Sequence, residues 1–162
     1  MRSNKNNGSR ALCARGFIVL WTALVIGLGL IARPAEAAPF AYVANGGSNT
    51  VSVIDTATKT VVATVGVGSG PDGIAVTPDG TQVYVANSGS NNVSVIHRPG
   101  NTVVKAIPVG TTPVGVAVTP DGTHVYVANN NSDTISVIAR PGNTVVATIP
   151  VGTGPVGVAI GP

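Results

Sequence analysis

After about residue 40, short apolar stretches of the chain alternate with polar turns. The stretches of one such series are residues 71–77, 83–87, 92–96 and 102–107. They are rich in Val, Ile and Thr, and the segments between them carry Gly, Pro, Asn and Asp, a pattern typical of short strands joined by tight turns. No segment in this region has ten residues of helical periodicity. The pattern therefore predicts an all-β region.

The same series recurs with a period of 42 residues. The tetrad Tyr-Val-Ala-Asn stands at residues 42–45, 84–87 and 126–129, and residues 83–120 align with residues 125–162 at 27 identities in 38 positions. A period of 20–50 residues indicates a repeat architecture. Four strands in such a unit predict the four-stranded blade of a β-propeller. The sequence repeats begin near residues 41, 83 and 125.

Small residues indicate which strand of each blade lies innermost. Gly73 and Ala75, and again Gly115 and Ala117, share one strand, as crowding of blades near a propeller axis requires. With that strand innermost, two complete blades cover residues 71–110 and 113–152. Residues 40–68 hold three outer strands, and residues 155–160 hold one unpartnered inner strand. We therefore expect about three blades' worth of an open or partial propeller, whereas propellers typically have 4–8 blades.

These segments resemble the YVTN family of bacterial β-propeller repeats. The resemblance rests on the Tyr-Val-Ala-Asn tetrads, the Val-Ser-Val-Ile or Ile-Ser-Val-Ile strand, the Val-Val-Ala-Thr strand and the segment Pro-x-Gly-x-Ala-Val-Thr-Pro-Asp-Gly, and it covers residues 40–162. Ala44, Ala86 and Ala128 stand where the family's name has Thr. The YVTN repeats are similar to larger propellers associated with lactone hydrolysis and with redox proteins that carry haem or quinone. The resemblance thus implies a propeller fold and, as an alternative function, a propeller enzyme.

The N-terminal segment has the three parts of a secretory signal peptide. A polar stretch with four basic residues, residues 1–15, precedes 17 mostly apolar residues, 16–32, and then the tripeptide Ala35-Glu36-Ala37. We expect residues 1–37 to be the signal peptide, with cleavage after Ala37. The repeat domain, residues 38–162, is then extracytoplasmic, in the periplasm, on the cell surface or secreted. The alternative is an uncleaved membrane anchor, because 17 residues reach the lower limit of a spanning helix.

Charge and cysteine content argue against a nucleic-acid partner and against a domain stabilised by disulfides. The full chain has a net charge of +3, but residues 38–162 hold four basic and five acidic residues, a net charge of −1. A near-neutral domain without a basic stripe is not typical of nucleic-acid binding. The single cysteine, Cys13, precedes the apolar segment, so the repeat domain has no disulfide framework.

Candidate catalytic and metal-binding residues do not form a recognisable site in the sequence. His97 and His124 lack the further ligands that a metal site needs. Asp79 and Asp121 suggest paired carboxylates, but they recur in the same Pro-Asp-Gly turn, where a turn-stabilising role explains both. The repeated serines Ser52, Ser94 and Ser136 have no histidine at a repeated offset. We predict no catalytic, cofactor-binding or metal-binding residue, and no cofactor.

The near-identity of the units favours a binding surface over an active site, because catalysis needs unlike residues in separate roles. The sequence therefore predicts an exported, non-enzymatic module that binds an unknown protein or glycan partner. The alternatives are a lactonase-like or redox-associated propeller enzyme and an inactive truncated propeller. The complementary edges at residues 40–68 and 155–160 also predict a homo-oligomer, because unpaired strand edges bind other chains.

Overall fold

The computed structural model describes residues 39–162, so the predicted signal peptide and its cleavage point after Ala37 lie outside the described part. This part contains eleven β-strands and one short 3₁₀ helix. Their bounds are β1 Phe40–Asn45, β2 Thr50–Asp55, β3 Thr60–Gly66, β4 Pro71–Val76, β5 Gln82–Asn87, β6 Asn92–His97, β7 Thr102–Pro108, β8 Pro113–Val118, β9 His124–Asn129, η1 Asn130–Ser132, β10 Thr134–Ala139 and β11 Thr144–Pro150.

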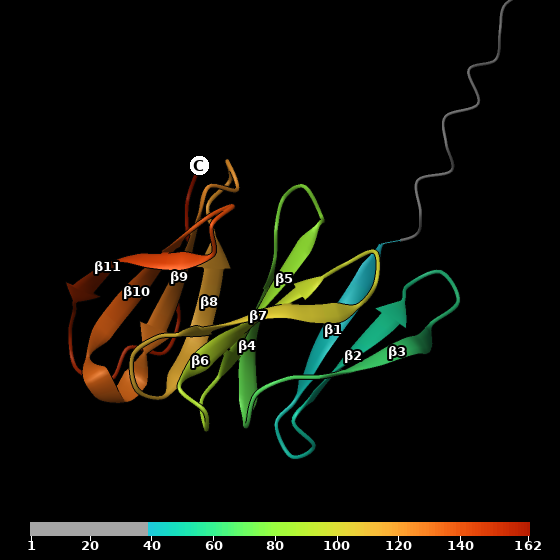
Figure 1. The fold of residues 1–162 in the computed structure, drawn as a ribbon, viewed down its shortest axis with the longest axis horizontal. Coiled ribbons are helices and arrows are strands. Elements are labelled where there is room, and N and C mark those ends of the chain that lie inside the picture. Colours follow the sequence, from blue (N-terminus) through green and yellow to red (C-terminus); the bar gives the residue numbers. More distant parts are fainter. Residues whose placement is uncertain (1–38) are drawn as a thin grey trace, which may run out of the picture. The chain divides into compact units, whose positions relative to one another are not determined.

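The strands form three antiparallel sheets that follow one another along the chain (Figure 1). The first blade is β1–β3, the second blade is β4–β7 and the third blade is β8–β11. The prediction of an all-β chain made of one three-stranded and two four-stranded blades is confirmed. Residues 151–162 contain no strand, and the expected inner strand at 155–160 has no paired neighbour within the described residues.

Apolar residues of adjacent blades meet in two separate clusters. Tyr84, Val93 and Ile107 of the second blade pack against Val125, Val127 and Ile138 of the third. The cluster between the first and second blades is built by Val51, Val53, Val65, Val83, Val85 and Ile96. Alternate strand residues point to opposite sheet faces, so each complete blade contributes to one cluster on each side. The hydrophobic cores of this domain therefore lie between the blades.

Two glycines allow the inner strands of successive blades to approach closely. A Cβ atom on Gly73 of β4 would lie 2.2 Å from the carbonyl oxygen of Val114 in β8. A Cβ on Gly115 would lie 2.3 Å from the carbonyl oxygen of Val156. Both distances are far below van der Waals contact, so only glycine fits at these positions. The small residues mark the innermost strand, as the sequence predicts.

A side-chain bond repeated at a fixed offset joins each blade to the loop that leads to the next one. The acceptor is an Asn or Asp in left-handed backbone conformation, which these two residue types tolerate better than most. The three bonds run from the amide of Gly70 to Asn49 Oδ1 (3.0 Å), of Thr112 to Asn91 Oδ1 (2.8 Å) and of Gly154 to Asp133 Oδ1 (2.8 Å). Equivalent bonds therefore fix the position of each blade relative to the next one in the same way.

Candidate functional site

The Pro-Asp-Gly turns hold their carboxylates by local hydrogen bonds. Asp79 Oδ1 accepts from the hydroxyl of Thr77 and from the amide and hydroxyl of Thr81, the latter two at 3.0 and 2.9 Å. Asp121 accepts equivalent bonds from Thr119 and Thr123. Such bonds favour the charged form. The hydroxyl of Thr77 and the amide of Thr81 hold the pKa of Asp79 well below its usual range, and those of Thr119 and Thr123 lower the pKa of Asp121 to about 2.

We expect the two turns to make the domain sensitive to acid. The pKa values of both carboxyls are lower in the folded state than the ordinary 3.8, so the unfolded chain binds protons first as pH falls. The stability from these bonds is present above about pH 4 and is lost as pH falls towards 2. Melting temperatures measured from pH 6 to pH 2 should show this loss, and it should be smaller in the double variant Asp79→Asn/Asp121→Asn. An equal loss in the wild type and in the double variant would contradict this explanation.

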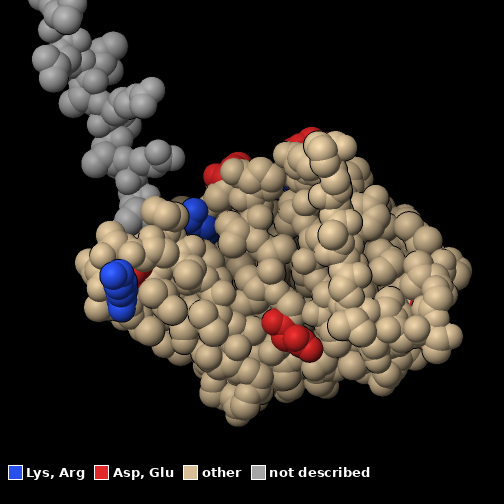
Figure 2. Space-filling model, turned by 180° about the vertical axis from the view of Figure 1, so that it is seen from behind, with Lys and Arg blue, Asp and Glu red and all other residues tan. Residues whose placement is uncertain are grey.

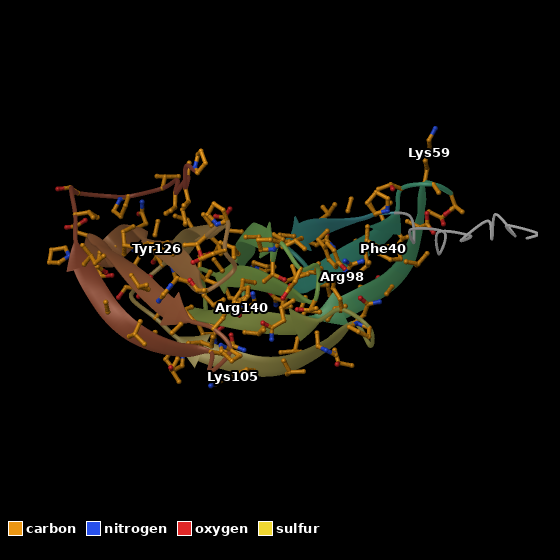
Figure 3. The ribbon with its side chains drawn as sticks, turned by 90° about the horizontal axis from the view of Figure 1, so that it is seen from above. Phe40, Lys59, Arg98, Lys105, Tyr126 and Arg140 are labelled. Atoms are coloured by element: carbon orange, nitrogen blue, oxygen red, sulfur yellow. The ribbon has the colours of Figure 1, made fainter. Side chains whose placement is uncertain are left out.

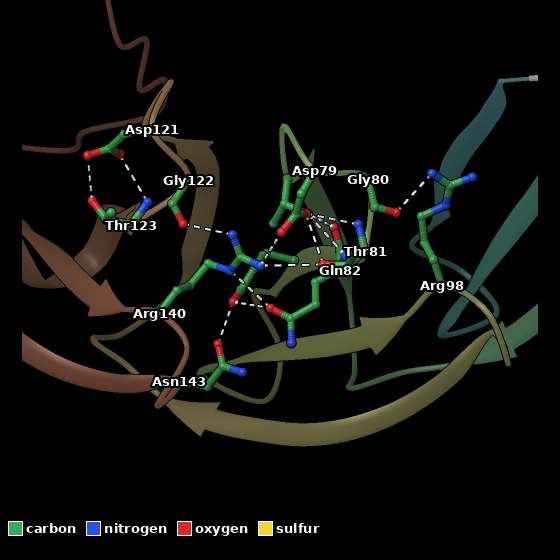
Figure 4. Close-up of polar contacts among 12 residues, drawn as sticks. Asp79, Gly80, Thr81, Gln82, Arg98, Asp121, Gly122, Thr123, Arg140 and Asn143 are labelled. Atoms are coloured by element: carbon green, nitrogen blue, oxygen red, sulfur yellow. Dashed lines mark hydrogen bonds and ion pairs between the residues drawn. The ribbon is translucent and has the colours of Figure 1, made fainter. Parts of the chain in front are cut away.

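Arg140 links the third blade to the turn of the second (Figure 4). Its Nη2 lies 3.1 Å from Asp79 Oδ2, an ion pair, and its Nε donates to Gln82 Oε1 at 3.0 Å. Its Nη1 donates to the carbonyl oxygen of Gly122 at 2.7 Å. The side chain is only 12% exposed. The protein itself therefore neutralises the guanidinium of Arg140.

The hydroxyl of Tyr84 belongs to the same polar group. It donates to Gln82 Oε1 at 3.0 Å and contacts Asn143 Oδ1 in the β10–β11 turn. Tyr84 is fully buried, and this burial raises the pKa of its hydroxyl. The residue thus joins the apolar cluster between the second and third blades to the polar contacts at its edge.

Arg98 occupies the equivalent position one repeat earlier but has different surroundings. Its Nη1 donates to the carbonyl oxygen of Gly80 at 2.9 Å, just as Arg140 binds Gly122. Gly80 has a φ of +65°, and a Cβ there would lie 2.7 Å from this Nη1, so the turn requires glycine. The guanidinium lies over the ring of Phe40, 5.4 Å from its centroid (Figure 3). This contact fixes Arg98 without neutralising its charge.

The difference follows from three positions shortly before the first Tyr-Val-Ala-Asn tetrad. Phe40 stands where the next repeat has Gln82, Pro39 stands where it has Thr81, and the sequence has an alanine at position 37 where it has Asp79. The acceptors that Arg140 uses are thus missing for Arg98. Among residues 39–162, the one ion pair is that between Arg140 and Asp79, and Arg98 has no carboxylate partner. The residues around Arg98 thus leave its guanidinium charge without a neutralising carboxylate among residues 39–162.

Arg98 borders an open hollow of about 300 Å³ between the first and second blades. Residues that line it include Phe40, Tyr42, Thr81, Pro99 and Asn101. The buried hydroxyl of Tyr42 has no hydrogen-bond partner within the described residues, although its counterpart Tyr84 has two. The hollow therefore combines an apolar ring, an arginine with unused donors and an unpaired hydroxyl. We call it the Arg98 hollow.

The second and third blades form a counterpart of about 270 Å³, lined by Asp79, Asp121, Gly122, Thr123, Arg140 and Pro141. It brings the two candidate carboxylates to one hollow, but Arg140 binds Asp79 there and the turn hydroxyls bind both. These contacts account for both aspartates structurally. Each of the two carboxylates therefore stabilises its own turn by accepting hydrogen bonds from it.

The remaining candidates lie apart from one another. His97 is exposed, and His124 Nδ1 lies 2.8 Å from the hydroxyl of Thr123. Ser94 and Ser136 are buried and accept bonds from Asn87 and Asn129 at 2.9 Å each, and Ser52 does the same with Asn45. Residues 39–162 contain no group of three or more His, Cys, Asp or Glu placed to hold a metal ion. No helix in this range is long and apolar enough to cross a membrane.

The model of the family "Lactonase, 7-bladed beta-propeller" matches residues 35–148. The chain belongs to this family. The resemblance to propeller repeats is thereby confirmed at the level of the lactonase and YVTN propellers. The match covers the first two blades, the third as far as residue 148 and the Arg98 hollow, so the hollow is part of a propeller domain.

Solved propeller structures give the same fold. A Kuenenia stuttgartiensis hydrazine synthase is 32% identical with a TM-score of 0.71, and the match covers 73% of this chain and 34% of that one. Dihydro-heme d1 dehydrogenase NirN in complex with DHE has a TM-score of 0.64 at 22% identity, over 74% of this chain and 27% of that one, a likeness of fold alone. This lactonase-family chain thus spans about a third or less of the length of these two chains.

A short sequence match was also found with the PE-PGRS family protein PE_PGRS18 of Mycobacterium tuberculosis (strain ATCC 25618 / H37Rv). It is 60% identical over 37 residues, which is 23% of this chain and 8% of that protein. The length of the match is close to one repeat.

Proposed function

We propose that this lactonase-family chain is an exported, non-enzymatic binding module that holds an acidic group of a protein or glycan partner in the Arg98 hollow. The observation that carries the proposal is the contrast between two equivalent arginines. Arg140 is neutralised by Asp79, whereas Arg98 lies on Phe40 without a carboxylate. A bound carboxylate would supply the charge that Asp79 supplies one repeat later.

The hollow suits such a group in three respects. A guanidinium has five N–H donors, and the bond to Gly80 uses one of them, so a carboxylate oxygen pair has donors to accept from. Tyr42 also lines the hollow, and its buried hydroxyl has no hydrogen-bond partner among residues 39–162. The surface also carries few charged side chains, as Figure 2 shows for one face, so little competes with Arg98 for an anion.

Binding to acidic and neutral polymers would test this function. We expect the chain to bind an oligouronate or a Glu-rich peptide and to ignore the matching neutral glycan or Gln-rich peptide. Arg98→Gln should weaken binding by about 10- to 100-fold, since a charge-assisted hydrogen bond contributes about 1.5–3 kcal/mol. The glycan and peptide arms distinguish the two sources of the carboxylate.

Lys105→Gln is the matched control, because it removes the same charge from an exposed lysine whose Nζ bonds the carbonyl of Gly142, away from the hollow. If Lys105→Gln weakens binding as much as Arg98→Gln, the attraction is general and the hollow is not the site. If neither acidic polymer binds, the proposed function is wrong.

Lactone hydrolysis is the second candidate, favoured by the family match. It predicts turnover of simple lactones that is lost in a single-residue variant. A panel of five- and six-membered lactones, followed by pH-stat, would decide between the candidates. Turnover by the wild-type chain that disappears in one variant while binding of the acidic polymer persists would establish the enzyme instead.

Export is part of the same proposal. The basic start, the apolar stretch 16–32 and Ala35-Glu36-Ala37 predict removal of residues 1–37. Intact-mass analysis of protein from the extracytoplasmic fraction should give a chain that begins at Ala38. A chain that retains Met1 in the membrane fraction would establish a signal anchor.

A further inference from the structure

The two equivalent arginines show which edge of the Arg98 guanidinium is open to a ligand. Arg140 binds a backbone carbonyl through Nη1, and its Nε and Nη2 bind Gln82 and Asp79 (Figure 4). Arg98 also binds a backbone carbonyl through Nη1, that of Gly80, but its Nε and Nη2 have no acceptor among residues 39–162. Nε and Nη2 form one edge of the guanidinium, which matches the two oxygens of a carboxylate.

Asn101 gives the Arg98 hollow a second polar group. It is the equivalent of Asn143, and both residues are in left-handed conformation, with φ of 47° and 53°. Asn143 is 7% exposed, and its Oδ1 contacts the hydroxyl of Tyr84. In contrast, Asn101 is half-buried, lines the hollow and makes no side-chain hydrogen bond among residues 39–162. The amide group of its side chain is therefore available to a ligand.

Arg98 and Asn101 lie close enough for one small ligand to reach both. They are the first and fourth residues of a turn that is closed by a 3.2 Å bond from the amide of Asn101 to the carbonyl of Arg98. The Cα atoms of two such residues are within about 7 Å of each other. A ligand that bonds both side chains thus carries further polar atoms near its carboxylate.

The side chain of Asn101 has both kinds of hydrogen-bonding group. Its Nδ2 is a donor and its Oδ1 is an acceptor. Thr81 lies at the same hollow, and because its hydroxyl donates to Asp79 at 2.9 Å, its oxygen is left to accept. A ligand with hydroxyls and ether oxygens beside its carboxylate satisfies all of these groups.

A hexuronate, which is a sugar ring with a carboxylate, has this arrangement. Its carboxylate is attached directly to a ring that carries hydroxyls and an ether oxygen, whereas two methylene groups separate a Glu carboxylate from the polar peptide backbone. Phe40 and Pro99 supply apolar surface in the hollow for the C–H groups of the ring. The volume of about 300 Å³ is at the lower end of ligand sites, which suits a single ring.

We infer that the acidic group held in the Arg98 hollow is a hexuronate unit of a glycan. Its carboxylate lies on the Nε–Nη2 edge of Arg98, and ring oxygens of the same sugar bond Asn101. This inference rests on the proposed function and narrows the partner from a protein or glycan to a glycan. Arg98 binds the charge of either kind of acid, and Asn101 determines the preference for the sugar.

Titration calorimetry with two acids of equal charge tests this preference. The probes are tetragalacturonate and tetraglutamate with blocked ends, which carry the same number of carboxylates. We expect the wild-type chain to bind tetragalacturonate at least about tenfold more tightly, since only the sugar bonds both Arg98 and Asn101. Arg98→Gln should weaken the binding of both probes.

Asn101→Gly separates the two kinds of contact, because glycine keeps the left-handed backbone without strain. It should weaken tetragalacturonate about 3- to 10-fold, as loss of neutral hydrogen bonds does, and leave tetraglutamate within about twofold. Asn131→Gly, at an exposed asparagine of the third blade, is the matched control and should leave both affinities unchanged. Melting temperatures of both variants should stay within a few degrees of the wild type.

The outcomes distinguish this inference from the proposed function. Equal binding of the two probes, or a loss in Asn101→Gly that is absent or the same for both, overturns the hexuronate while an acid-binding hollow stands. If neither probe binds, or if Arg98→Gln loses no affinity, the proposed function fails as well.

Phe40 permits a direct test of where the sugar lies. The sequence has two phenylalanines, Phe17 and Phe40, and Phe40 lines the hollow. In a chain with ¹³C-labelled phenylalanine, we expect nuclear Overhauser effects between the Phe40 ring and C–H protons of bound tetragalacturonate. Phe40→Leu assigns the signals of this ring. Saturable binding of the sugar without such effects would overturn the inference.

Discussion

Replacing Tyr84 by alanine is expected to lower the free energy of unfolding by about 3 kcal/mol, as large-to-small changes of buried aromatic residues do. Tyr84 is fully buried in the cluster between the second and third blades. Its hydroxyl also bonds Gln82 and contacts Asn143 of the next blade. The variant therefore loses apolar contacts and leaves polar groups of two blades without a partner. Urea unfolding followed by circular dichroism measures the effect.

His97→Ala is the control for this experiment. His97 is exposed at the end of β6, and the next repeat has Ala139 at the same position. We expect its effect to be below about 0.5 kcal/mol, the usual range for surface substitutions. Equal losses of stability in the two variants would mean that the apolar clusters between blades are not what stabilises the array.

Replacing Gly73 by alanine is expected to cost about 3 kcal/mol, at the upper end of what overpacking costs. The added methyl group would lie 2.2 Å from a backbone oxygen of Val114, so strands β4 and β8 must separate. Separation also opens the apolar clusters on both sides of the second blade. The midpoint of urea unfolding should fall accordingly.

Gly47→Ala is the matched control, since a Cβ at Gly47 meets no atom within 4 Å and its φ is not positive. We expect a change below about 0.5 kcal/mol there. If Gly73→Ala is tolerated as well as Gly47→Ala, the inner strands do not pack as closely as described.

The blade architecture follows from the sequence because each part of the signal is local and is written three times. The Val-Ser-Val-Ile strand predicts β6 and its equivalents, and the Pro-Asp-Gly turn predicts the hairpin between β4 and β5. The sequence also predicts that the blades begin at other positions than the sequence repeats do. Gly73 and Gly115 indicate this, because they fit only where the backbones of two inner strands meet. A pattern that recurs at equivalent positions of three repeats is not a chance effect of composition.

The Arg98 hollow is not apparent from the sequence in the same way. Arg98 and Arg140 both precede the identical segment Pro-Gly-Asn-Thr-Val-Val, so their local sequences predict the same role. Their difference arises from residues 58 to 61 positions earlier, where Asp79, Thr81 and Gln82 meet Arg140. The signal that identifies Arg98 is the loss of those residues in the first repeat, at Pro39 and Phe40. It becomes meaningful only when the contact between blades is known.

If Arg98, unlike Arg140, is available to an external acid, the side-chain Nε–H signals of these two arginines will respond differently to that acid. Residues 38–162 contain no other arginine, so the mature chain should give two such signals in a ¹H–¹⁵N spectrum. During titration with an oligouronate or a Glu-rich peptide, we expect a saturable shift of the Arg98 signal, absent in Arg98→Gln, and an unchanged Arg140 signal. An unmoved Arg98 signal, or equal movement of both signals, would contradict this expectation.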